Sequence, residues 1–169
     1  MEQNLNLFNN TSEVWSKILE ESLVIKKKEP LLKFFVDKKI NVHKSFQDCL
    51  SNLVADNLNS DFLNYNELRK ITDFAIDNDE EIVVSCIEDI LANIDRDPAC
   101  TRFINPFLYY KGFQALQCYR IAHFYLKKGE VDLAYFMQML VSNKFSVDIH
   151  PSACIGKGIL MDHAHGIVI

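Results

Sequence analysis

Glycine is missing from the first 111 residues of this 169-residue chain, because all five glycines lie in its last third. The glycine-free part is predicted to be helical. No uninterrupted apolar run approaches the length of a membrane helix. The first ten residues, MEQNLNLFNN, have neither the basic leader nor the apolar segment of a secretory signal. We therefore expect a cytoplasmic protein with no membrane partner.

The sequence also lacks paired cysteines and an excess of positive charge. Its five cysteines are widely spaced and form no C-x-x-C pair, so neither a disulfide framework nor a zinc site is indicated. Reduced thiols of a cytosolic protein explain them better. The net charge of −5 gives no electrostatic footprint for nucleic acid. We expect no metal site and no nucleic-acid partner.

Helical periodicity dominates the chain up to about residue 143. Asn10 and Glu13 resemble a capping box at the start of a first helix. Apolar stripes predict further helices, the clearest over about residues 79–94. One more is expected from Asn105–Pro106 to Lys127–Lys128–Gly129, and a last one from about 131 to 143.

The end of the chain has a different period. Ile149, Ile155, Met161 and Ile167 recur at intervals of six, which fits neither a helix nor simple strand alternation. Hexapeptide repeats are typical of a parallel β-helix, in which one side chain per facet points into a narrow core.

Three blocks of the sequence resemble a known family. They are Arg96–Ala99, the run PFLYYKGFQALQCYRIAHFY at 106–125, and VDIHPSACIGKGILMDHAHGIVI at 147–169. In these blocks the chain resembles serine O-acetyltransferase. The resemblance implies an α + β fold: an all-α amino-terminal domain, residues 1–144, followed by the start of a left-handed parallel β-helix, residues 145–169. It also implies a homo-oligomer, a trimer through the β-helices or a hexamer through the helical domains.

The resemblance further implies a site. Acetyl transfer from acetyl-CoA, the co-substrate, to the L-serine hydroxyl needs a base, because a protonated hydroxyl is a poor nucleophile. In the family pattern that base falls on His163, and Asp148 orients its ring. Asp97 and Asp162 are expected to hold serine. L-cysteine is the expected feedback inhibitor in the same pocket, cysteine synthase is the expected protein partner, and no bound cofactor is implied.

Several residues have a structural alternative. Asp97, before Pro98, could merely initiate a turn, and Asp148 could be a loop carboxylate. The remaining candidates are expected to be structural: His150 as a polar rim residue, His123 as a packed or capping side chain, and His165 in no more specific role. Met137, Met139, Cys118 and Cys154 are expected to be apolar fillers.

The chain also departs from the family pattern, because relatives continue with more coils, a Gly-rich loop and the acetyl-CoA site. We expect a truncated serine acetyltransferase that is inactive alone and poorly ordered after residue 145. One alternative is a non-catalytic oligomerisation module that binds full-length enzyme. Another is a hexapeptide acyltransferase with a different hydroxyl acceptor, against which the Asp97 loop argues. Ile169 is expected to belong to a strand rather than to a tail that docks cysteine synthase.

Overall fold

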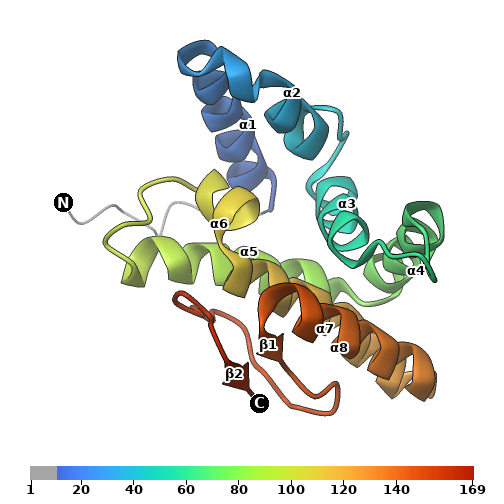
Figure 1. Ribbon diagram of the computed structural model, residues 1–169. Coiled ribbons are helices and arrows are strands. Elements are labelled where there is room, and N and C mark those ends of the chain that lie inside the picture. Colours follow the sequence, from blue (N-terminus) through green and yellow to red (C-terminus); the bar gives the residue numbers. More distant parts are fainter. Residues whose placement is uncertain (1–10) are drawn as a thin grey trace.

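Helices build most of the molecule. The computed structural model describes residues 11–169 (Figure 1). The helical elements are α1 (Thr11–Lys28), η2 (Pro30–Leu32), α2 (Lys33–Val36), η3 (Asp37–Asn41), α3 (Phe46–Leu58), α4 (Tyr65–Asn78), α5 (Glu80–Arg96), α6 (Ile104–Tyr109), α7 (Lys111–Lys127) and α8 (Val131–Phe145). Strands β1 (Val147–Asp148) and β2 (Ile167–Val168) follow. The all-α prediction is confirmed for the described residues up to 145.

Polar side chains begin several helices. The Ser45 hydroxyl accepts a hydrogen bond from Asp48 N at the start of α3, and Asn64 forms a capping box with Glu67 at the start of α4. Asp79 caps α5, which confirms the helix predicted there. The capping box predicted from Asn10 lies outside the described residues.

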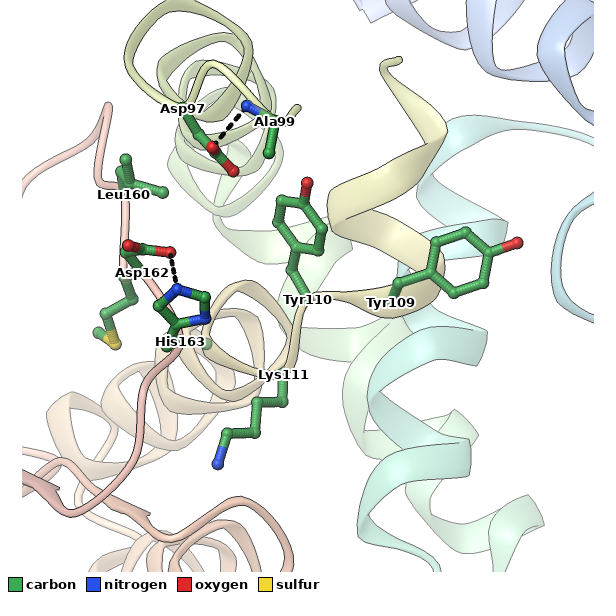
Figure 2. A pocket seen from close by; sticks show the side chains of 10 residues that line it. Asp97, Ala99, Tyr109, Tyr110, Lys111, Leu160, Asp162 and His163 are labelled. Atoms are coloured by element: carbon green, nitrogen blue, oxygen red, sulfur yellow. Dashed lines mark hydrogen bonds and ion pairs between the residues drawn. The ribbon is translucent and has the colours of Figure 1, made fainter. Parts of the chain in front are cut away.

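The long helix predicted from Asn105 to Lys127 is interrupted. Tyr110 has extended backbone angles, φ −93° and ψ 102°, so α6 ends at Tyr109 and α7 begins at Lys111. Periodicity could not show this break, because the apolar positions continue through it. The break turns the two neighbouring rings apart: Tyr109 stacks on Phe35 at 6.4 Å, whereas Tyr110 faces the loop after α5 (Figure 2). At the other end of α7, Lys128 is the C-cap and Gly129, with φ 90°, follows it, so the helix ends where the sequence predicted.

One apolar core joins the helices to the segment after α8. Its centre includes Phe46, Phe107 and Phe113, with ring centroids 5.9 and 6.0 Å apart. Val147, Ile149 and Ala164 are buried in the same cluster. The carboxyl-terminal segment therefore shares the core of the helices.

Burial confirms some of the predicted filling side chains and corrects others. Met137 and Cys118 are fully buried, as expected. Met139 is 45% exposed, because it lies on the outer face of α8, and Cys154 is exposed in the loop before the second hexapeptide. Neither of these two residues fills the core, so the predictions for them were wrong.

Strands β1 and β2 pair in parallel, Val147 with Ile167 and Asp148 with Val168. Ile169 N donates to Asp148 O at 2.9 Å and extends the pairing by one bond. The expectation that this stretch is a strand is thus confirmed for Ile167–Val168. Paired positions are 20 residues apart in the chain, two more than the 18 of three hexapeptides, so Val168 lies beside Asp148. Among the described residues, no helix is both long and apolar enough to cross a bilayer.

Candidate active site

One face of α7 holds the loop between β1 and β2. Side chains on this face bond to carbonyl oxygens of the loop: Tyr119 to Ala153 (2.5 Å), Arg120 to Gly156 (2.9 Å) and His123 Nδ1 to Pro151 (2.7 Å). Because a carbonyl oxygen only accepts, the proton of neutral His123 is on Nδ1. The prediction that His123 is a packed residue is confirmed. Carbonyl contacts of this kind fix the path of the loop without depending on its side chains.

Gly112 allows the loop to approach the start of α7 very closely. A Cβ atom at this position would lie 2.4 Å from Met161 O and 2.7 Å from the Ala164 methyl group. Real Cβ atoms do not come so near a backbone oxygen, so only glycine fits here without movement. The contact brings Met161 and the two residues after it against the break between α6 and α7.

A pocket of about 420 Å³ lies at this junction (Figure 2). Three of the four predicted site residues line it: Asp97 from the end of α5, and Asp162 and His163 from the loop. Tyr110 and Lys111, from the break before α7, line it as well. Residues that are up to 66 positions apart in the chain therefore meet at one cavity.

Asp97 both ends a helix and lines the pocket. Its Oδ1 accepts a hydrogen bond from Ala99 N at 2.8 Å, and its carbonyl oxygen accepts one from Cys100 N at 2.9 Å. These bonds are those of the turn that Asp97–Pro98 could initiate. The turn-forming role is thus present, and it directs the same side chain toward the cavity.

His163 sits at the tip of a strained turn. His163 and Ala164 have φ angles of 51° and 43°, a region that residues other than glycine rarely adopt. Ala164 N donates to Asp162 O across the turn, and the Ala164 side chain is buried. The imidazole is 93% exposed, with Nε2 3.6 Å from Asp162 Oδ1. Burial of Ala164 therefore holds the turn while His163 projects outward, beside Asp162.

Asp148 lies elsewhere. Its Oδ1 accepts a hydrogen bond from Gln138 Nε2 of α8 at 2.6 Å, and it lines a separate depression with Ser142 and Asn143. The hydrogen bonds and ion pairs of the described residues do not join Asp148 to His163. Their pairing stays a prediction.

The other two loop histidines are exposed. His150 packs on the Tyr135 ring at 5.5 Å, in keeping with a rim position. His165 Nδ1 lies 3.5 Å from Lys111 Nζ. Neither of them lines the pocket that contains His163.

Tyr110 and Lys111 are pocket residues that the sequence did not single out. Burial raises the pKa of Tyr110 to about 12, and the neighbouring Cys100 and Asp97 add to this shift. The phenol therefore stays protonated at neutral pH and can donate a hydrogen bond. Only the helix break could have revealed these residues, and the sequence pattern carries no signal of that break.

The pocket offers two carboxylates, one ammonium group, one phenol and one imidazole. Such a set suits a small polar molecule that carries an ammonium group, and the imidazole could accept a proton from it. Within residues 11–169, no group of three or more His, Cys, Asp or Glu side chains is placed to hold a metal ion. The side chains that line the described pocket suit proton transfer and charge recognition.

Comparison with known proteins identifies the family. Residues 14–118 match the family model described as the amino-terminal part of serine acetyltransferase. A serine acetyltransferase of Buchnera aphidicola from Acyrthosiphon pisum is 40% identical over 158 residues, which are 94% of this chain and 58% of the relative. That of Escherichia coli K12 is 40% identical over 92% of this chain and 57% of its own length. The chain thus spans somewhat less than two thirds of these relatives.

Solved structures agree with this match. A serine acetyltransferase in complex with CoA superposes with a TM-score of 0.92 and 38% identity, over 95% of this chain and 68% of the other. A serine acetyltransferase in complex with cysteine superposes with a TM-score of 0.91 and 38% identity, over 94% of this chain and 66% of the other. The Neisseria gonorrhoeae serine acetyltransferase in complex with serine superposes with a TM-score of 0.89 and 37% identity, over 92% of this chain and 64% of the other. All three structures are serine acetyltransferases. The chain belongs to the serine acetyltransferase family.

Proposed function

We propose that this chain acts in the transfer of an acetyl group from acetyl-CoA to the hydroxyl of L-serine, giving O-acetylserine for cysteine biosynthesis. The observation that carries the proposal is the meeting of Asp97, Asp162 and His163 at one pocket. Relatives solved with CoA and with serine support both substrates. Acetyl-CoA is a co-substrate, and no bound cofactor is required.

In the proposed reaction, Asp97 and Asp162 bind the serine ammonium and hydroxyl groups. The His163 imidazole takes the hydroxyl proton as the oxygen attacks the thioester carbonyl, and the proton then passes to the leaving thiol of CoA. Asp148 orients the ring, as the acid does in a histidine–carboxylate pair. This last role requires a bond from the His163 ring to the Asp148 carboxylate, which accepts a hydrogen bond from Gln138 here. L-cysteine competes for the serine pocket, a role supported by the relative solved with cysteine.

The parallel pair β1–β2 is proposed to open a left-handed β-helix, with the boundary after residue 144. Its support is the helix end at Phe145 and the parallel register of the two strands. The working enzyme is proposed to be a cytoplasmic homo-oligomer, a trimer or hexamer, that binds cysteine synthase.

A non-catalytic role as an oligomerisation module is the second candidate. The observation that favours it is an exposed apolar surface on η2 and α2, where Leu31 is 99% exposed and Phe34 80% exposed. Apolar side chains of this size rarely stay in water without a partner when they are clustered. This second role predicts that the chain alone does not acetylate serine.

The test compares the chain alone with a chimera in which a relative's later coils follow residue 169. His163→Ala in the chimera should lower turnover by about 10² to 10⁴, whereas His165→Ala, a neighbouring exposed histidine, should leave it near normal. Asp97→Asn should weaken serine and cysteine binding together. Unchanged turnover in the His163 variant would remove the proposed base. Robust turnover by the chain alone would refute its predicted inactivity.

A further inference from the structure

A buried carboxylate, Asp89 of α5, lies at the centre of a polar cluster behind the pocket. Its side chain is fully buried, and that of Arg120 is 7% exposed. Asp89 Oδ2 accepts hydrogen bonds from Arg120 Nη2 at 2.7 Å, Arg120 Nε at 3.1 Å and Gln117 Nε2 at 3.1 Å. These three bonds join α5 to α7 and satisfy one of the two oxygens.

The second oxygen of Asp89 bonds to the loop. Oδ1 accepts a hydrogen bond from Ile159 N at 2.8 Å. Arg120 Nη2 also donates to Gly156 O at 2.9 Å, so the same ion pair holds both an N–H and a C=O group of the loop. Ile159 directly precedes Leu160, the first loop residue of the pocket.

The position of Asp89 on α5 gives this contact its importance. Asp97, which forms the opposite side of the pocket, is the C-cap of the same helix. Eight residues of helix rise by about 12 Å, and a helix is a stiff spacer. Helix α5 therefore carries one pocket wall itself and holds the other wall through Asp89.

Stability alone does not explain a charged group in this place. Replacing a buried ion pair by apolar side chains of similar volume is often neutral or stabilising, so such a pair is weak evidence for stability. A carboxylate does provide two oxygens with fixed relative geometry, and here one of them bonds to α7 while the other bonds to the loop. The arrangement serves to fix the relative position of three segments.

We propose that Asp89 is a positioning residue: its Oδ1 holds the Ile159 amide and so fixes Leu160, Asp162 and His163 opposite Asp97. The consequence for serine rests on the proposed function, whereas the consequence for the loop does not. Asp89 itself does not line the pocket, so it acts through the backbone of the loop.

A matched pair of double variants isolates the contact. Asp89→Asn with Arg120→Met and Asp89→Leu with Arg120→Met both remove the ion pair and leave no unpaired buried charge. Asn and Leu have nearly the same shape, but only Asn keeps an oxygen that can accept from Ile159 N. Each double variant removes one negative and one positive charge, so the net charge of the chain is the same in both.

Amide hydrogen exchange followed by NMR on the 169-residue chain is the first measurement. The Leu variant should speed exchange at Ile159 and at residues 160–164 by about tenfold or more relative to the Asn variant. Amides of α3 and α4 should match between the two. Equal exchange at Ile159 in both variants would overturn the proposal. If the variants fail to fold, hydrogen exchange of the unmodified chain still tests the proposal. An Ile159 amide that exchanges as fast as the amide of exposed Lys157 would also overturn it.

Serine kinetics in the chimera are the second measurement. The Leu variant should raise the KM for serine and lower kcat, the Asn variant should recover both, and the KM for acetyl-CoA should change little. Recovery by Asn is not expected from a general loss of stability, which the two variants share. If the exchange pattern holds while the parent chimera does not acetylate serine, the proposed function fails and the positioning role of Asp89 stands.

Discussion

The helices and the loop after them are built by different means. Helices α3, α4 and α5 each begin at a side chain that caps their own first turn, and their apolar faces contribute to one core. The loop between β1 and β2 is closed by the short pairing of these two strands, and bonds from α7 and α5 hold much of the rest. The helices are therefore locally encoded, whereas the loop takes its shape from them. The pocket lies where the two regions meet.

Loss of a core ring in the helices should have the largest effect. Phe107→Ala removes a buried ring that contacts both Phe46 and Phe113, so the free energy of unfolding should fall by about 3–5 kcal/mol. Denaturant unfolding measures this change. Phe62→Ala, at a residue that is 84% exposed, is the control and should stay within about 0.5 kcal/mol of the parent. Equal effects would contradict the assigned core.

A methyl group added at residue 112, where the loop contacts α7, should affect the loop and leave the helices unchanged. Gly112→Ala places a Cβ against Met161 O, and overpacking of this kind costs about 1–3 kcal/mol. Hydrogen exchange should show faster opening at residues 160–164 and little change in α3 and α4. Gly156→Ala is the control in the same loop, because nothing lies within 4 Å of its added Cβ. A loop that is unaffected by Gly112→Ala would contradict the close contact.

Removal of a helix cap should act on the helices alone. Asn64→Ala abolishes the side-chain bonds to Asn66 N and Glu67 N and should lower the free energy of unfolding by about 1 kcal/mol. Asn66→Ala, two residues further along α4 and exposed, should be neutral or slightly stabilising. Thermal unfolding monitored by circular dichroism compares them. Faster hydrogen exchange in the loop but not in α4 would contradict the claim that the cap stabilises its own helix.

The smallest expected effect is a change in pH dependence. Burial raises the pKa of Glu21 above its ordinary value of 4.5, although Ile104 N and Phe103 N favour the charged form. A raised pKa in the folded state adds stability below pH 4.5 that is lost as the pH rises through the folded value. Glu21→Gln, which does not titrate, should therefore gain in midpoint temperature relative to the parent between pH 4.5 and 7. Parallel curves for the parent and the Glu21→Gln variant would contradict the shift.

Much of the fold could be predicted because its signals are local. The helix at 80–96 follows from its cap and apolar stripe, and the change of period marked the segment after residue 145. The break at Tyr110 could not be predicted, because it is set by packing: Tyr109 contacts Phe35, which lies far away in the sequence. Met139 and Cys154 were placed inside for the same reason, since residue type does not tell which face of an element is covered.

The site shows the same limit. Asp97, Asp162 and His163 were found through the family motifs, and the structure brings them to one pocket. Asp148 was assigned by the same resemblance, yet it lies against Gln138, so its role as the orienting acid stays a prediction. Asp89 is outside those motifs, and its importance depends on a contact with Ile159, 70 residues away. Contacts of this kind become visible only when the chain is folded.

The central claim is that α5 and α7 place Asp97, Asp162 and His163 around one serine site. Its most direct test is an NMR titration of the isotope-labelled 169-residue chain with L-serine, with L-alanine as the ligand control. The account predicts saturable shifts at Asp97, Ala99, Tyr110, Asp162 and His163, which weaken in the Asp97→Asn variant. Saturable shifts confined to the depression around Ser142, Asn143 and Asp148, or none up to millimolar serine, would contradict it.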